Sequence, residues 1–426
     1  MNNLQNYLLI GGGVLLILFF LIFAGIIPGL RKSEPPPVTL EFWGVEDDSA
    51  IWREILEDLK KTHPNLSVNY LRLDEASHEN VLINRLAEGS GPDVFFLKNS
   101  WVAKHKDKIF PLSEKGLKYG ARDFRHEFVD IAAGDMLTAQ GEILGLPLYV
   151  DTLALFYNKD IFNSSGVAAP PLTWEELLVV SAKVTRRDAQ GKVTRGGLAL
   201  GTTRNTENFF EILSALILQN GDPIIRKDAG RQISLEERAE EALKFYVSFA
   251  NVSAPNYSGG LVAKSSLDAL ADGSVAMTIG FARDVKRVLA RNPHLDLGIA
   301  PLPQVKDAPV MSYGSYYFPV VSRLSHDPAS AWQLLFYVTS RDSVKKYLEA
   351  TEKPAARRDL ISLGAPTDEL DVFYRQALVA KNWPVPEEAS ALRIFRDMID
   401  AASSFTESSA NQAVNRAKEQ LRLLLP

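Results

Sequence analysis

The stretch GEILGLPLYVDTLALFYNKDIFNSSGVAAPPLTWEEL, residues 141–177, decides the fold that the sequence predicts. Residues 146–150 and 152–157 are apolar, β-rich runs, which predict two strands buried within a sheet. The following Thr173-Trp174-Glu175-Glu176 has the pattern of a capping box, in which the threonine hydroxyl accepts from an unpaired backbone N–H and the glutamate reaches back. We therefore expect two strands followed by a helix through about Lys183.

Residues on the N-terminal side alternate strand and helix patterns. Runs 38–43, 66–73 and 93–97 predict strands, and runs 49–61 and 80–88 predict amphipathic helices. Five alternating elements in about sixty residues indicate a doubly wound α/β unit.

Residues on the C-terminal side continue the alternation. Further helices are expected at 235–252, 265–271 and 327–338, and further strands at 275–279, 297–302 and 316–321. The C-terminal third is mostly helical in pattern, so the α/β class extends over the whole chain after its first residues.

The composition excludes several functional classes. The 426 residues carry 47 basic and 52 acidic side chains, a net charge of −5, without a basic block for nucleic-acid phosphates. The chain has no cysteine, which excludes disulfides, thiolate metal sites, a cysteine nucleophile and lipid attachment through cysteine. Its 6 histidines are scattered without an HExxH or HxH pair, so we expect no metal site and no cofactor.

Residues 8–30 are an uncharged apolar run. As a helix this run reaches about 35 Å, enough to cross a hydrocarbon layer of about 30 Å. A cleaved secretory signal is the alternative, but residues 1–7 lack Lys and Arg and no clear small-x-small cleavage site is present. We therefore expect residues 1–34 to be an uncleaved transmembrane anchor and a stiff linker, although Arg31 and Lys32 oppose an extracytoplasmic C-terminal part under the positive-inside rule.

Five motifs, in order, resemble those of the extracellular solute-binding proteins of ABC importers, in the sugar-binding group that includes maltose-binding protein. They are FW (Phe42, Trp43), HPNLSVNYLRL (63–73), GSGPDVFFL (89–97), the 141–177 stretch and LADGSVAMTIG (270–280). Together they cover nearly all of the chain after its N-terminal segment.

That resemblance implies a two-lobed α/β clamshell, the type II fold of periplasmic binding proteins. We expect one lobe from 35–150 plus about 303–348, and the other from 151–302 plus about 349–426. Strands joining the lobes are expected near 148–152, 301–305 and 345–353. The resemblance also implies an extracytoplasmic monomer, not an enzyme, that closes on a sugar or oligosaccharide and delivers it to ABC permease subunits.

Sugars bind through aromatic faces and through planar polar groups that make paired hydrogen bonds with hydroxyls. Side chains of both kinds follow the predicted strands, whose carboxyl ends open into a cleft. The candidate ligand-binding residues are Trp43, Glu46, Asp47, Asn99, Trp101, Asp151, Arg204, Asn205, Phe281, Arg283, Tyr313, Tyr316 and Trp383. Structural alternatives stay open: Trp43 as the buried end of a strand, Asp47 as a partner of a helix N-terminus, and Asp151 as half of a hinge ion pair.

Two departures from the family pattern affect the ligand and leave other functions open. Maltose-type relatives carry a tryptophan shortly after the AMT strand and an aromatic before an AAS-like turn, where this chain has Phe281-Ala282-Arg283 and 390–393 (SALR). The stacked platform for a linear glucan is incomplete, and Arg204 and Arg283 could favour an anionic sugar derivative or another small solute. A membrane-anchored solute sensor is a further alternative. A glycosidase is disfavoured, because the sequence shows no local carboxylate pair with a matching signature.

Overall fold

The computed structural model describes residues 36–45, 47–113, 119–204, 206–226, 232–258, 264–403 and 409–425. The expected membrane segment at 8–30 lies outside these residues. Among the residues described, no helix combines the length and apolar character needed to span a bilayer.

The first α/β body is built on a four-stranded sheet in the order β13-β3-β1-β2. Its strands are β1 (Val38–Val45), β2 (Leu66–Leu73), β3 (Val94–Lys98) and β13 (Tyr317–Val321). β1 pairs in parallel with β2 and β3, and β13 runs antiparallel to β3. The first four residues of β3 are buried, as expected for an apolar run covered on both faces.

The second α/β body is built on a five-stranded sheet in the order β11-β5-β10-β7-β6. Its strands are β5 (Ala154–Asn158), β6 (Arg186–Arg187), β7 (Val193–Leu198), β10 (Val275–Gly280) and β11 (Leu297–Pro301). All six residues of β10 are buried, which confirms the central strand expected at 275–279. β10 pairs in parallel with β7, and β5 runs antiparallel to both β10 and β11.

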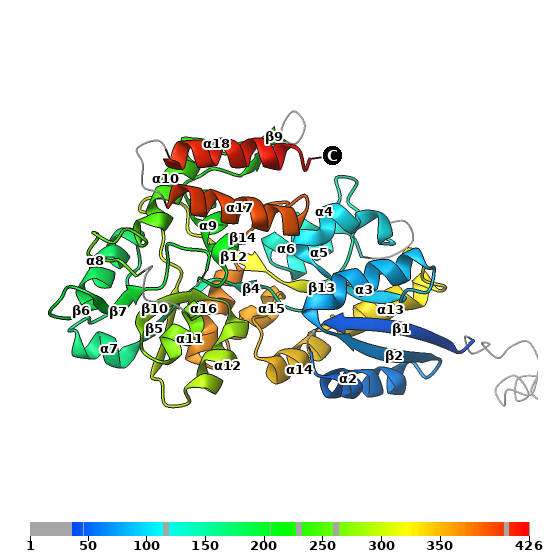
Figure 1. Cartoon of the computed structure of the whole chain (residues 1–426). Helices are drawn as coiled ribbons and strands as arrows, with labels where there is room; N and C mark the ends of the chain where they lie inside the picture. The colour runs from blue at the N-terminus through cyan, green and yellow to red at the C-terminus, as the bar shows by residue number, and fades with distance from the viewer. Residues whose placement is uncertain are drawn as a thin grey trace, which may run out of the picture.

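A three-stranded sheet in the order β14-β12-β4 lies between the two bodies (Figure 1). Its strands are β4 (Asp151–Thr152), β12 (Ser312–Ser315) and β14 (Ala380–Lys381). β12 pairs in parallel with β14 and antiparallel with β4, so β4 and β14 are the two edges of this sheet. A separate hairpin is formed by β8 (Ile225–Arg226) and β9 (Gln232–Ile233).

Helices cover both large sheets. Those that contribute mainly to the first body are α2 (Ser49–Thr62), α3 (Glu75–Ala87), η1 (Asn99–Trp101), α4 (Val102–His105), η2 (Lys106–Lys108), α5 (Ala121–Glu127), α6 (Asp130–Met136), α13 (Pro328–Val338), α14 (Arg341–Thr351) and α15 (Arg358–Ile361). The others are α7 (Lys159–Ser164), α8 (Trp174–Val184), α9 (Phe209–Gln219), α10 (Glu237–Ser248), α11 (Ser266–Ala271), α12 (Ala282–Arg291), α16 (Asp368–Ala377), α17 (Glu388–Ala402) and α18 (Ser409–Arg422).

The two bodies have separate hydrophobic cores. The first core contains Phe42, Trp52 and Phe96 from the N-terminal part and Tyr347 from α14. The second core contains side chains from β5, β10, α9, α17 and α18. Ala355, Ala356, Leu360 and Ile361 also pack in the first core, after the boundary expected near 349. The exact division of the chain into lobes stays a prediction.

The stretch 141–177 differs from expectation at two places. Residues 146–150 form no strand; Tyr149 makes only an isolated bridge to Ala355. Pro147 has no backbone N–H to donate, and the N–H groups around it go to different segments: Leu146 N donates to Pro319 O of β13 at 3.4 Å, and Val150 N donates to Pro354 O at 3.0 Å. The run expected at 152–157 is divided between β4 and β5 at Leu153.

The expected helix start at Thr173 is confirmed. The Thr173 hydroxyl accepts from the backbone N–H of Glu176 at 3.2 Å. The Glu176 carboxylate reaches back one residue further than a standard capping box, to the N–H of Leu172 at 2.8 Å. Both bonds satisfy N–H groups at the start of α8, which therefore begins at Trp174.

Candidate functional site

A small pocket lies between the two bodies, beside β4. Its volume of about 20 Å³ leaves room for about one water molecule. The residues that line it come from α3, β3, β13, α12, the three-stranded sheet β14-β12-β4 (hereafter the hinge sheet) and the irregular segments next to these elements. They are Glu75, Lys98, Tyr149, Asp151, Arg283, Ser315, Tyr316, Tyr317 and Lys353, hereafter the front pocket.

Asp151 is the buried centre of the front pocket, with 1% of its surface exposed. Its Oδ1 accepts from the backbone N–H of Ala282 at 2.8 Å and of Thr152 at 2.9 Å. Ala282 is the first residue of α12, so the carboxylate faces the positive end of that helix. Burial raises the pKa of Asp151 to about 6, although the Arg283 charge and the Ala282 N–H act in the opposite direction.

Arg283 connects this hinge carboxylate with the second body. Its Nη1 lies 3.4 Å from Asp151 Oδ2, and its guanidinium carbon lies 3.9 Å from the centroid of the Phe281 ring. The side chain remains 35% exposed. A stacked, partly exposed guanidinium keeps donors available for the oxygen atoms of a ligand.

The first body supplies the opposite wall. The Tyr317 hydroxyl donates to Glu75 Oε1 at 3.1 Å, and the Tyr149 hydroxyl accepts from the Tyr317 backbone N–H at 3.2 Å. The Lys353 ammonium lies 4.4 Å from the Tyr149 ring centroid and forms an ion pair with Asp47. Burial raises the pKa of the Tyr149 hydroxyl to about 12, so this group is neutral at physiological pH.

Glu388, the first residue of α17, links the second body to the end of β3 in the first. Its Oε1 accepts from Lys98 Nζ at 2.8 Å, and its Oε2 accepts from Trp101 Nε1 at 2.6 Å. The side chains of Lys98 and Glu388 are only 16% and 12% exposed. These contacts hold the two bodies together next to the front pocket.

The structure brings together part of the predicted site. Asp151, Arg283 and Tyr316 line the front pocket. Asp47 bonds to the lining residue Lys353, and Trp101 bonds to Glu388, which also accepts from the lining residue Lys98. Asp151 also forms the hinge ion pair that was its structural alternative. Whether these side chains contact a ligand stays a prediction.

Other predicted residues are placed elsewhere. Trp43 packs in the first core, and Phe281, Tyr313 and Trp383 pack in the second core, with no more than 8% of any of the four exposed. The Trp383 indole donates to Ser214 Oγ at 3.0 Å. Burial in a core explains why these aromatic rings present no open face to the front pocket. Arg204 is exposed and is not among the lining residues, and Glu46 and Asn205 lie outside the described residues.

The predicted set lacks six of the pocket residues: Glu75, Lys98, Tyr149, Ser315, Tyr317 and Lys353. Lys98 directly follows the apolar run of β3, so its position at the carboxyl end of a central strand was a usable signal. Lys353 comes from the loop after α14, about 200 residues along the chain from Tyr149, and no local pattern marks it.

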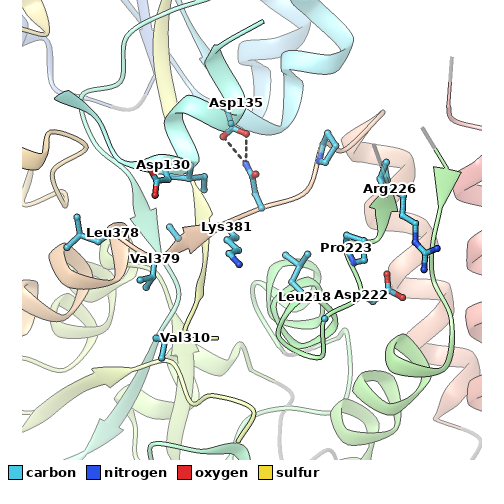
Figure 2. A pocket seen from close by; sticks show the side chains of 17 residues that line it. Asp130, Asp135, Leu218, Asp222, Pro223, Arg226, Val310, Leu378, Val379 and Lys381 are labelled. Atoms are coloured by element: carbon cyan, nitrogen blue, oxygen red, sulfur yellow. Dashed lines mark hydrogen bonds between the residues drawn. The ribbon is translucent and has the colours of Figure 1, made fainter. Parts of the chain in front are cut away.

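A larger groove lies at the other edge of the hinge sheet, next to β14 (Figure 2). It measures about 850 Å³ and is bounded by α6, the end of α9, residues 221–226, Val310 and residues 378–384, hereafter the rear groove. Asn382 donates to both carboxylate oxygens of Asp135 there, at 3.0 and 2.8 Å. Asn99 and the Tyr316 hydroxyl also donate to Asp135, so these two predicted residues support the hinge from the rear side.

No cluster of three or more histidine, aspartate or glutamate side chains suited to a metal ion is found in the part of the chain that the structure describes. The front pocket offers groups for hydrogen bonds and ion pairs. Carboxylates, hydroxyls, ammonium groups and a guanidinium face one another across it.

Comparison with known proteins gives consistent matches. The family model described as bacterial extracellular solute-binding protein matches residues 43–345. The maltodextrin-binding protein of Bacillus subtilis is 26% identical over 356 residues, 78% of each chain, and a putative binding protein of Brucella abortus is 22% identical over 70% of each chain. The fold is similar to that of the sugar-binding protein of Xanthomonas citri, with a TM-score of 0.74 at 20% identity over 91% of this chain and 98% of that one.

Proposed function

The chain belongs to the family of bacterial extracellular solute-binding proteins, and on this premise we propose that it captures a small carbohydrate between its two lobes and delivers it to the permease of an ABC importer. The Bacillus subtilis relative named for maltodextrin supports the choice of a carbohydrate. A fold like that of a cyclo/maltodextrin-binding protein complexed with maltotetraose agrees with it, at a TM-score of 0.75 over 92% of this chain and 98% of that one, although 19% identity carries only the fold.

The observation that carries this proposal is the composition of the front pocket. Paired oxygens on Asp151 and Glu75, hydroxyls on Tyr149 and Tyr317, and the Arg283 guanidinium surround one small space at the hinge. Polyols need this mixture of planar acceptors and donors, because each sugar hydroxyl donates one hydrogen bond and accepts others. The two tyrosine rings add apolar surface for the C–H faces of a sugar.

The charges in the pocket support a neutral ligand over an anionic one. Arg283 pairs with Asp151, and Lys98 pairs with Glu388. Lys353 pairs with Asp47. A sugar acid would have to displace one of these carboxylates or lie beside it, which costs free energy in a poorly solvated site. The anionic alternative, suggested by Arg204 and Arg283, therefore ranks second.

The size of the front pocket supports hinge motion as the binding mechanism. Ligand pockets generally measure about 300–1,000 Å³, far more than the roughly 20 Å³ between these lobes. A sugar therefore needs the lobes to separate about the hinge sheet and then to close around it. The hydrogen bonds of the closed site become stronger as water leaves.

Thermal unfolding of the full-length chain with added sugars, oligosaccharides and sugar acids tests this function. A ligand at 100 times its Kd stabilises the folded state by about 2.7 kcal/mol, a clear rise in Tm. We expect neutral sugars to give the shift and Arg283→Met to abolish it, whereas Arg204→Met, which changes an exposed arginine outside the pocket, should keep it. Stabilisation by sugar acids alone would move the anionic alternative to first place.

We also propose that residues 8–30 anchor the protein in the membrane, with the lobes on the extracytoplasmic side. The uncharged run supports this proposal. The native protein should then stay in the membrane fraction after a high-salt wash. A native N-terminus that begins after residue 24 would show that the segment is a cleaved signal.

A further inference from the structure

The first body carries two exposed apolar side chains at one end of its sheet. Phe110 is 39% exposed and Leu324 is 52% exposed. The backbone N–H of Ser325 donates to Ser322 O at 3.1 Å, which places Leu324 at the tip of a tight turn directly after β13. The backbone N–H of Phe110 donates to Val321 O at 2.8 Å, so the two apolar residues belong to neighbouring segments.

Basic side chains accompany these two apolar residues. Residues 106–110 and 322–324 together carry three basic side chains and one acidic side chain, Asp107. The backbone N–H of Arg323 donates to Lys108 O at 2.8 Å, so the basic residues of the two segments lie next to each other. Asp107 forms an ion pair with Lys108 at 3.1 Å. We refer to Lys106, Lys108, Phe110, Arg323 and Leu324 as the tip surface, which is apolar and carries a surplus of positive charge.

The tip surface lies at the end of the first body where β1 begins. Val321, the last residue of β13, pairs with Val94 at the start of β3, and Phe42 of β1 pairs with Val94 from the other side. Val38 therefore extends from the sheet at this same end, two strands or about 10 Å to the side of β13. Lys98, at the opposite end of β3, lines the front pocket, and the hinge sheet lies at that opposite end (Figure 1).

The length of chain before β1 keeps this end of the body close to the proposed anchor. Only residues 31–37 lie between the apolar run 8–30 and Val38. A chain of this length spans at most about 25 Å when it is fully extended. The headgroup layer on one side of a bilayer takes up about 5–8 Å of that span. Because Val38 and the tip surface share one end of the sheet, the anchor brings the tip surface within reach of the lipid.

The composition of the tip surface suits the surface of a bilayer. Apolar side chains lie favourably at the boundary between headgroups and acyl chains, and Lys and Arg pair with anionic headgroups while their stems cover apolar surface. Val179 of α8 shows the contrast, because it is 69% exposed but belongs to the second body, on a helix that begins with Glu175 and Glu176. Apolar exposure there is accompanied by negative charge, which anionic lipid repels.

We propose that the tip surface is a membrane-contact site, which docks the first body on anionic phospholipid headgroups with Phe110 and Leu324 at the boundary of the acyl chains. This inference rests on the proposed membrane anchor in residues 8–30. The carboxyl ends of β1 and β3 then face away from the lipid, together with the front pocket next to them. Docking therefore fixes the orientation of the first body and does not cover the pocket with lipid.

Spin labels on the full-length protein in vesicles test this contact. The chain has no cysteine, so Leu324→Cys and the control Val179→Cys each accept one label at an exposed position. The vesicles consist of phosphatidylcholine with a minor share of phosphatidylglycerol and a nickel-chelating lipid. We expect the headgroup nickel to relax the label at position 324 several times more strongly than the label at position 179.

A matched pair of charge variants separates docking from tethering alone. Arg323→Glu should lower the ratio of docked to undocked protein at least roughly fivefold, because one basic residue near an anionic surface contributes about that factor. Arg393→Glu makes the same change at an exposed position on α17 of the second body and should leave the signal at position 324 unchanged.

The outcomes distinguish the contact from the anchor. Equal relaxation of both labels, in protein that stays in the vesicles, overturns the membrane-contact site alone. An effect of Arg323→Glu no larger than that of Arg393→Glu overturns it as well, because the tether would then account for the position of the tip surface. Protein that leaves the vesicles in a high-salt wash overturns the proposed anchor and this inference with it.

Discussion

The front pocket and the rear groove lie at opposite edges of the same three-stranded sheet, and they differ in volume and in the side chains that line them. The rear groove measures about 850 Å³ and the front pocket about 20 Å³. Each is lined by five charged side chains, but the front pocket also has three tyrosines and the rear groove has none. Under the proposed hinge mechanism, a small volume does not argue against a binding site, because closure removes volume where the polar groups converge.

The largest expected effect concerns residues 378–384, which border the rear groove. It tests whether this segment contributes to the second hydrophobic core and is not free to bind a ligand. Trp383 is 2% exposed, stacks on Phe395 with centroids 5.9 Å apart and donates to Ser214. Trp383→Ala should lower the free energy of unfolding by about 3–5 kcal/mol, because it leaves a large cavity in the second core. Denaturant unfolding measures this loss, and Leu378→Ala, at a 39% exposed position nearby, is the control with a much smaller effect. Near-parental stability of Trp383→Ala would mean that the ring is available for binding, as the sequence suggested.

The next effect concerns the buried carboxylate of the front pocket. The pKa of Asp151 rises from 3.8 to about 6 on folding, so between these values the native state binds more protons than the unfolded state. Its contribution to stability is therefore fully present below about pH 4 and is lost as the pH rises through 6. Asp151→Asn removes this dependence but keeps an oxygen for the Ala282 N–H.

Urea unfolding of the parent and of Asp151→Asn at pH 4 and pH 7 measures the difference. The stability of the variant relative to the parent should increase by about 2–3 kcal/mol between the two pH values. A constant difference would mean that Asp151 is not desolvated and that the front pocket is open to water.

A smaller effect is expected for ligand binding at the first-body wall. Tyr317→Phe removes the hydroxyl that donates to Glu75 and keeps the ring. Loss of one hydrogen bond of about 0.5–1.5 kcal/mol should weaken sugar binding roughly twofold to tenfold by calorimetry. Tyr119→Phe removes a similar hydroxyl, bonded to Glu127 at 2.9 Å away from the pocket, and should bind like the parent. Equal affinities for the parent and both variants would remove Tyr317 from the site.

The smallest effect is expected in the rear groove. Val310 is 62% exposed there, and Val310→Ser should change the free energy of unfolding by no more than about 0.5 kcal/mol. Sugar affinity should stay within about twofold of the parent in calorimetry. A tenfold loss of affinity would give the rear groove a part in binding and weaken the contrast between the two regions.

The sequence predicted the parts of the fold that local patterns specify. The buried strand at 275–279, the strand at 93–97 and the helix start at Thr173 are all present, because apolar runs and caps act over a few residues. The run at 146–150 was expected to be a strand and is not one, since Pro147 cannot donate to a ladder.

The candidate site was less predictable, for a reason visible in particular residues. Asp151 and Arg283 were accessible to sequence reasoning because Asp151 lies at the expected first crossing between the lobes and Arg283 comes shortly after the predicted strand at 275–279. Trp383 and Tyr313 look like cleft aromatics in the sequence but pack in the second core, a choice that only tertiary packing makes. Lys353 reaches the pocket from a distant loop, and Glu388 acts through contacts across the two lobes.

A crystal structure of the protein with the neutral sugar that gives the largest thermal shift tests the central claim most directly. The account predicts the sugar between the lobes at the hinge, with its hydroxyls bonded to Asp151 and Arg283. A sugar bound in the rear groove next to Asn382, with the front pocket still shut, would contradict it.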